Sequence, residues 1–184
     1  MKALVVYESM FGNTERVARA IGLGLSASVE VEVCSVAEAP DSLPADLSLL
    51  VVGGPTHAFS MSRRRTRLDA VQQGGHGDAS SGLREWLSTV APPEGDLHLT
   101  TFDTRVGGAR HLPGSASTSA ARLARRRGFP HVANGGSFYG QGVTGPLEVG
   151  EVERATAWGR CLGSQPRSPR RSRRHEAARW LARI

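Results

Sequence analysis

The stretch Ala3-Leu4-Val5-Val6-Tyr7-Glu8-Ser9-Met10-Phe11-Gly12-Asn13-Thr14 decides the fold prediction. It opens with a continuous apolar run, which is typical of a strand buried on both faces of a sheet. The run passes into glycine, hydroxyl and amide side chains, which indicate a loop. Val17, Ile21 and Leu25 then recur at helical spacing, and we expect Asn13 or Thr14 to cap the helix that carries them.

Four more strands are predicted further along the chain. Val29 to Val33 alternates between apolar and charged residues, which indicates a strand at a sheet edge with one face in water. Leu47 to Val52 is apolar except at Ser48 and stops at Gly53-Gly54-Pro55. Leu97 to Phe102 and His131 to Ala133 complete the set, and Ser137 to Tyr139 either extends the last strand or lines the loop after it.

Helical patterns separate these strands. They predict helices over residues 63–73, 83–90 and 115–127, and a last helix from Gly150 onward. Trp86 and Trp158 lie on apolar stripes and are expected in the core. Strands that alternate with helices indicate the α/β class, with helices on both faces of a parallel sheet. The buried and edge strands fit a doubly wound five-stranded sheet of order 2-1-3-4-5.

Charge divides the chain into a neutral body and a basic tail. Residues 1–163 carry 16 basic and 16 acidic side chains, whereas residues 164–184 carry seven arginines and one glutamate. We therefore predict one domain over 1–163 and a C-terminal tail over 164–184. The tail is rich in arginine, proline and serine and ends in a short apolar stripe at helical spacing, formed by Ala177, Trp180, Leu181 and Ile184.

The tail has several interpretations. It suits a nucleic-acid arm, a membrane-surface helix or a partner dock. We favour packing of the stripe on the body or on a second copy, because a single short arm supports only weak, salt-sensitive binding. A homodimer therefore stays open, and neither a membrane nor a nucleic-acid partner is expected.

The sequence also bears on compartment and metal binding. No apolar run approaches the roughly 20 residues that span a bilayer, and the first apolar segment is too short for a signal peptide. We expect a soluble cytoplasmic protein. Cys34 and Cys161 lie far apart and outside any CxxC pair, so we expect two buried free thiols and no metal site.

Three loops, residues 8–14, 55–63 and 104–114, are predicted to meet at the carboxyl edge of the sheet, where such folds bind ligands. The first loop offers neutral donors and the start of a helix, a combination that suits a phosphate group. Neither GxxxxGK[ST] nor GxGxxG follows the first strand. Hydrolysis of a nucleoside triphosphate and dinucleotide binding of that kind are therefore disfavoured.

Tyr7-Glu8-Ser9-Met10-Phe11-Gly12-Asn13-Thr14-Glu15 resembles the phosphate-binding loop of flavodoxins and flavodoxin-like FMN proteins. It is especially similar to the Ser/Thr-Met-aromatic-Gly-Ser/Asn-Thr variant in the flavin domains of flavodiiron proteins, and Gly53-Gly54-Pro55-Thr56 also matches the family. The resemblance covers most of residues 2–163 and implies a flavodoxin-like fold with FMN as cofactor. The implied cofactor-binding residues are Ser9, Met10, Phe11, Gly12, Asn13, Thr14, Pro55, Thr56, His57, Ala58, Phe59, Thr104, Arg105, Val106, Gly107 and Gly108.

Two features depart from the family pattern. Residues 104–111 lack the usual tyrosine or tryptophan over the flavin, which leaves His57, Phe59 or His111 as candidates. The neutral body also differs from the acidic faces with which most flavodoxins dock basic reductases. A cation near the ring, such as Arg105 or Arg110, would favour the anionic reduced flavin and make its potential less negative.

The implied function is FMN-dependent electron transfer, in which the chain accepts electrons from a reductase and passes them to a redox protein partner. No catalytic acid or base is expected, because electron transfer requires none. Two alternatives stay open. One is an FMN-dependent NAD(P)H:quinone-type oxidoreductase of the same fold. The other is a flavodoxin-fold module that has lost FMN and docks protein or nucleic acid through its basic tail.

Overall fold

The computed structural model describes residues 1–93 and 95–165, and their centre is a parallel sheet of order β2-β1-β3-β5-β6. These strands are β1 (Lys2–Tyr7), β2 (Glu30–Ser35), β3 (Leu47–His57), β5 (His98–Val106) and β6 (His131–Ala133). Two short strands lie off this path: β4 (Ser60–Met61) is antiparallel to β3, and β7 (Ser137–Gly140) is parallel to β5. The predicted class and order are confirmed, because β5 is the fourth long strand and β6 and β7 both pair with it in the fifth position.

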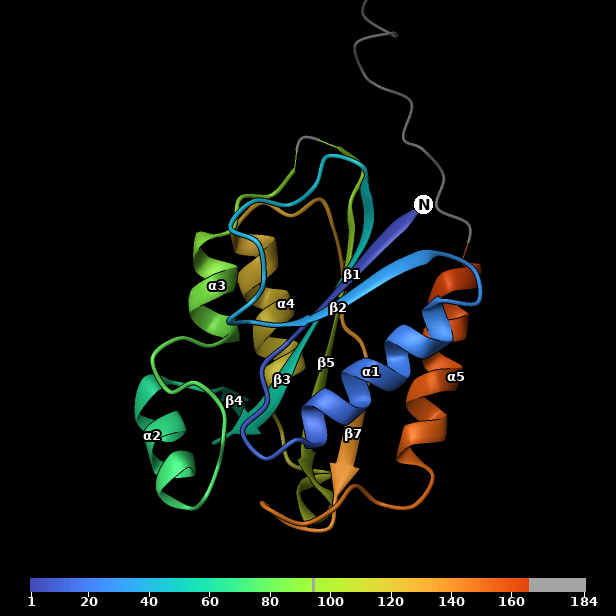
Figure 1. The fold of residues 1–184 in the computed structure, drawn as a ribbon. Helices are drawn as coiled ribbons and strands as arrows, with labels where there is room; N and C mark the ends of the chain where they lie inside the picture. Colours follow the sequence, from blue (N-terminus) through green and yellow to red (C-terminus); the bar gives the residue numbers. More distant parts are fainter. Residues whose placement is uncertain (94, 166–184) are drawn as a thin grey trace, which may run out of the picture.

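Helices cover both faces of the sheet (Figure 1). On one face lie α1 (Asn13–Leu25) and α5 (Glu151–Ser164), and on the other lie α3 (Leu83–Thr89) and α4 (Ala116–Arg126). The fifth helix, α2 (Arg64–Gln72), lies beyond α3 at the carboxyl edge, and the short turn η1 (Gly107–Ala109) follows β5.

The two hydrophobic clusters follow from the alternation of side chains along the buried strands. In β1, Leu4 and Val6 face the cluster under α3 and α4, whereas Ala3 and Val5 face the cluster under α1 and α5. Trp86 is buried in the first cluster, as predicted, and Trp158 packs partly buried against the second. The sheet is therefore fixed from both sides, and its carboxyl edge is held as a rigid frame.

Four local predictions are wrong. The residue that caps α1 is Gly12, because the side chains of Asn13 and Thr14 bond to Gly145 and to Thr104 of β5 instead of the helix. The strand expected to end at Phe102 continues to Val106, since β7 pairs with its last residues. The strand expected to stop at Gly53-Gly54-Pro55 continues to His57, because these three residues pair with β5 and the last two residues pair with β4. Cys34 is buried, but Cys161 is exposed on α5.

The predicted basic tail and its apolar stripe fall almost wholly on residues 166–184, which lie outside the described residues. The division of the chain at residue 163 therefore stays a prediction, and α5 continues through Ser164. Across residues 1–93 and 95–165, no helix is both long enough and apolar enough to cross a bilayer.

Candidate cofactor site

A cavity of about 300 Å³ opens at the carboxyl ends of β1, β3 and β5. Open parallel sheets bind ligands at this position, and the volume is at the lower end of the range for ligand pockets. The wall is formed by the loop after β1, the ends of β3 and β5, one face of α2 and the chain after β7. The lining residues are Ser9, Met10, Phe11, Asn13, Thr14, Pro55, Thr56, His57, Ala58, Thr66, Asp69, Ala70, Gln73, Thr104, Arg105, Val106, Gly140, Gly142 and Val143.

The cavity brings together most of the residues implied by the resemblance. Of that set, Gly12, Phe59, Gly107 and Gly108 do not line it. Gly12 forms the bend before α1, and Phe59 lies at the tip of a hairpin. Gly107 and Gly108 lie in η1, where Gly107 faces the Glu148 carboxylate. Contact of the lining residues with a cofactor stays a prediction.

Two parts of the wall lie outside the predicted set. One is the α2 face with Thr66, Asp69, Ala70 and Gln73, and the other is the segment with Gly140, Gly142 and Val143. The spacing of the α2 residues marks one face of a helix in the sequence. Which way that face points depends on contacts with residues far along the chain. The segment after α2 packs under the first loop, where the His76 N–H donates to the Met10 carbonyl over 2.9 Å.

The N-terminus of α1 is open toward a ligand. Gly12 has a φ of 87°, and no atom lies within 4 Å of the place where a Cβ would be. Within the described residues, the backbone N–H groups of Asn13, Thr14 and Glu15 find no acceptor. The Gly12 N–H donates to Ser9 Oγ over 3.1 Å, which leaves the Ser9 O–H free to donate to a ligand. Such a cluster of donors at a helix start suits an anionic group.

The N-terminus of α4, at the same edge of the sheet, is closed. The Ala116 N–H donates to Thr56 Oγ1 over 2.9 Å, and the Ser117 N–H donates to Asp103 Oδ2 over 3.0 Å. The Thr118 N–H donates to Ser115 Oγ over 3.1 Å. The first N–H groups of α4 are therefore satisfied by the protein itself. Of these two helix starts, the start of α1 is the one that remains available to an anion.

Polar bonds hold α1 to the opposite walls of the cavity. The Thr14 and Thr104 hydroxyls share a buried hydrogen bond with 2.6 Å between their oxygens. The Asn13 Nδ2 group donates to the Gly145 carbonyl over 2.6 Å, in the loop after β7. These bonds link α1 to the loop after β7 and to β5. The predicted contact of the two side chains with a ligand stays a prediction.

His57 lines the cavity near the end of β3 and is half-buried. Burial lowers its pKa below the usual value, and the charge of Arg67 lowers it further. The imidazole is therefore neutral at neutral pH and keeps one N–H donor and one acceptor.

Beneath α2 lies a buried charge cluster that the sequence did not single out. Arg67 is fully buried; its Nη1 donates to Ser62 Oγ over 2.9 Å and lies 3.1 Å from Glu85 Oε2. Glu8, which directly precedes the first loop, is also buried, and its Oε2 accepts the Leu83 N–H over 2.8 Å. Burial raises the pKa of Glu8. The cluster connects the first loop, α2 and the start of α3, and so supports the cavity from behind.

Arg105 and Arg110 occupy different environments. Arg105 lines the cavity, and its Nη2 donates to the Ala109 and Leu112 carbonyls over 2.6 and 3.1 Å. Arg110 forms an ion pair with Glu148, lies over the Tyr139 ring at 4.0 Å from its centroid, and does not line the cavity. Of the two arginines, Arg105 is the one placed to act on a ligand.

Comparison with solved structures shows that this architecture is a flavodoxin fold. One similar structure is a flavodoxin from the domain Archaea, with 20% identity and a TM-score of 0.58 over 89% of this chain and 96% of that chain. Another is the flavodoxin of Streptococcus pneumoniae TIGR4, with 14% identity and a TM-score of 0.55 over 88% of this chain and 99% of that chain. The chain also matches 35% of the flavodiiron protein from Giardia intestinalis, with 18% identity and a TM-score of 0.55 over 88% of its own length.

No family model and no curated protein sequence matches the chain. The likeness in structure confirms the flavodoxin-like fold that the first loop predicted.

Proposed function

We propose that this chain binds FMN noncovalently in the cavity and carries electrons between a reductase and a redox protein partner. The observation that carries the proposal is the open N-terminus of α1, which faces the cavity while that of α4 is closed. Bound FMN would supply the redox chemistry. The neighbours named as flavodoxins support this function through the shared fold.

In this proposal the FMN phosphate lies against the first loop. The free N–H groups of Asn13, Thr14 and Glu15 and the Ser9 hydroxyl donate to its oxygens. These are neutral donors in a partly buried site, assisted by the positive end of the helix dipole. The loop therefore binds a dianion without a lysine or arginine of its own, and Gly12 leaves the space that the phosphate needs.

The residues at the ends of β3 and β5 would hold the flavin ring between them. Pro55, Thr56, His57 and Ala58 form one side, and Thr104, Arg105 and Val106 form the other. The neutral His57 offers a hydrogen-bond donor, and Arg105 is the one arginine among the lining residues. Its positive charge favours a reduced, anionic flavin, so we expect a less negative potential than in an acidic flavodoxin.

The proposal is tested by comparing FMN with riboflavin, which has the same ring but no phosphate. Titration calorimetry should give a dissociation constant for FMN at least about 100-fold lower than for riboflavin, because several charge-assisted hydrogen bonds go to the phosphate. Ser9→Asp places a carboxylate at the start of α1. We expect this substitution to weaken FMN binding by about 100-fold and to leave riboflavin binding unchanged.

Ser115→Asp is the matched control, because it introduces the same charge at the closed start of α4. It should leave FMN binding intact. Equal affinity for FMN and riboflavin, or equal effects of the two aspartates, would contradict the proposal. A purified chain that oxidises NADPH with a quinone, without an added reductase, would instead support the quinone reductase alternative.

A further inference from the structure

An exposed aromatic ring stands beside the cavity on a strained turn. Ala58 and Phe59 join β3 to β4, and their φ angles are 45° and 64°. Two-residue turns of this kind favour Asn and Gly, because a larger side chain is strained at positive φ. Phe59 is nevertheless 52% exposed, so its ring adds little to the core. Strain of this sort persists where function requires it.

The hairpin that carries Phe59 is firmly supported. Arg84 donates to the Met61 carbonyl over 2.8 Å and to Ser60 Oγ over 3.1 Å, and Ser60 Oγ donates to Ser119 Oγ of α4 over 3.0 Å. Gly114 lies against the turn, and a Cβ there would come within 2.7 Å of the Phe59 carbonyl oxygen. The backbone that carries Phe59 is therefore held in place before any partner binds, which reduces the entropy lost on docking.

The segment after the hairpin is strongly basic. Arg63, Arg64 and Arg65 are exposed and form no ion pair with any described residue. Arg64 and Arg65 lie in the first turn of α2, which contains no acidic residue. Positive charge opposes the helix dipole at this end. Stability of the fold therefore does not explain these arginines.

Apolar side chains continue around the mouth of the cavity. Leu112 is 47% exposed, and its carbonyl accepts from the cavity-lining Arg105. Val143 is 64% exposed and lines the cavity itself. The hairpin and the segment after it bring together an exposed aromatic ring and arginines that form no ion pair with a described residue. This is the composition of a protein interface, in which aromatic residues and arginine contribute most of the binding energy.

We propose that Phe59 and the arginines 63–65 form a docking surface for an acidic redox protein. The proposal rests on the proposed function, because a partner of bound FMN must approach the cavity beside this surface. Arginine pairs with carboxylates through two parallel hydrogen bonds, and a positive patch speeds the approach of a negative partner. The Phe59 ring would enter a pocket on that partner as the central contact.

The sign of the charge is tested with small oxidants on the reduced, FMN-loaded chain. Each hexacyanoferrate(III) trianion takes one electron, so two ions reoxidise one fully reduced FMN; hexaammineruthenium(III), a trication, reacts with the same balance. The rate with the trianion should fall as salt is added, and the rate with the trication should rise. At low salt, the double variant Arg64→Gln/Arg65→Gln should react with the trianion at least about threefold more slowly than the wild type.

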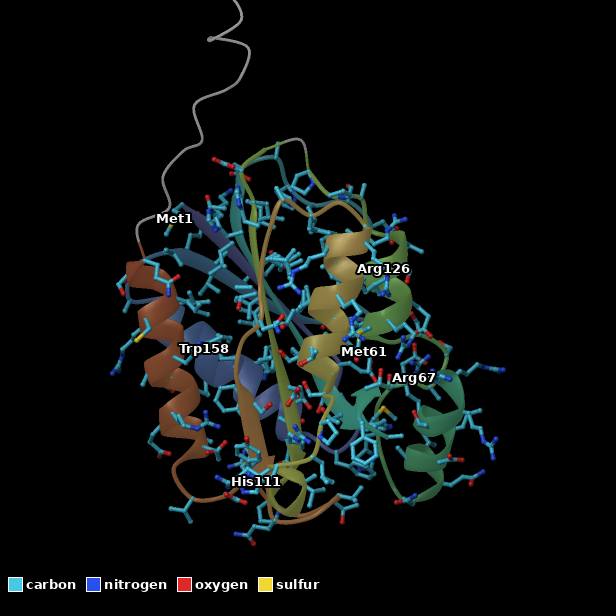
Figure 2. All side chains as sticks on the ribbon, turned by 180° about the vertical axis from the view of Figure 1, so that it is seen from behind. Met1, Met61, Arg67, His111, Arg126 and Trp158 are labelled. Carbon is cyan, nitrogen blue, oxygen red and sulfur yellow. The ribbon has the colours of Figure 1, made fainter. Side chains whose placement is uncertain are left out.

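The matched control is Arg126→Gln/Arg127→Gln, which removes the same charge from exposed positions at the end of α4. Figure 2 shows Arg126 at the end of α4 remote from Arg67 and His111. This control should leave both rates unchanged. Equal effects of the two double variants would overturn the proposal. So would a rate with the trication that is higher at low salt than at high salt.

Phe59→Gly tests whether the Phe59 ring contributes to docking, with a redox protein as the probe. Glycine relieves the strained φ, so the variant should unfold at a higher denaturant concentration than the wild type. The rate at which reduced plant-type ferredoxin, an acidic donor, reduces the FMN-loaded chain should nevertheless fall about tenfold at subsaturating ferredoxin. Leu23→Ala, which trims a 67% exposed side chain on α1, is the control and should not change this rate.

An unchanged ferredoxin rate in Phe59→Gly would contradict the docking surface. So would a rate with the basic acceptor cytochrome c that falls as salt is added while the rate with ferredoxin does not. These outcomes differ from failure of the proposed function. A chain that takes up no FMN shows no flavin absorbance in any variant, whereas a failed docking proposal leaves FMN bound and the variant rates equal.

Discussion

Thr14 and Thr104 share a buried hydrogen bond, with 2.6 Å between their side-chain oxygens. One residue lies in the first turn of α1 and the other near the end of β5, so the bond joins the two sides of the cavity. Because both oxygens are buried, removal of either partner leaves the other without a partner in a region poor in water.

The first prediction concerns this bond. Thr14→Val and Thr104→Val should each lower the free energy of unfolding by about 1–2 kcal/mol. The double variant should lose less than the sum of the two, with a coupling of about 1 kcal/mol from a double-mutant cycle in urea. Strict additivity would show that the two hydroxyls do not depend on each other.

The second prediction concerns the cluster beneath α2. Arg67→Ala should destabilise the fold by about 3–5 kcal/mol, because it removes the cation from a cluster that contains the buried Glu8 carboxylate. Loss of support for α2 should also weaken FMN binding. The control is Arg64→Ala on the same helix, which is exposed and should stay within about 0.5 kcal/mol of the wild type. Similar unfolding midpoints for the two variants would contradict this account.

The third prediction concerns His57 and pH. Burial lowers the pKa of His57 in the native state, whereas the unfolded chain titrates at the ordinary value near 6.5. As the pH falls through that value, the unfolded chain gains a proton before the native chain does, so the native state loses stability. Urea unfolding between pH 7.5 and 5 should show a smaller loss in His57→Gln. The same loss of stability in His57→Gln and in the wild type would contradict this account.

The fourth prediction separates two arginines near the proposed flavin. Arg105→Gln removes the positive charge that lines the cavity and should lower the potential of bound FMN by about 60 mV, equivalent to about 1.4 kcal/mol per electron. Arg110→Gln, outside the cavity and already paired with Glu148, should leave the potential unchanged. Spectroelectrochemistry on both variants gives the comparison, and equal potentials would remove Arg105 from the electrostatic account.

The fifth prediction concerns the two thiols. Burial raises the pKa of Cys34 to about 11, with Glu32 and Glu38 adding to the effect, and Cys161 is exposed. The folded chain should therefore react with one equivalent of Ellman's reagent at pH 8 and with a second only after denaturation. Cys161→Ser should abolish the first reaction. Rapid reaction in that variant would place Cys34 at the surface.

Local patterns of neighbouring residues were sufficient to predict the fold class and the loop that bends into α1, and they were consistent with the strand order. An apolar run buried on two faces, a loop with glycine and a helical stripe are local patterns, because strand burial and helical packing repeat every two or every three to four residues. The resemblance of residues 7–15 to a phosphate-binding loop is local in the same way.

Which donors remain free for a ligand was decided by contacts between residues far apart in the chain. Asn13 or Thr14 was expected to cap α1, but their side chains bond to Gly145 and Thr104. Asp103 and Thr56, from different strands, close the start of α4 and leave that of α1 open. A hydrogen bond needs two groups about 3 Å apart, and only the folded sheet brings these groups to that distance.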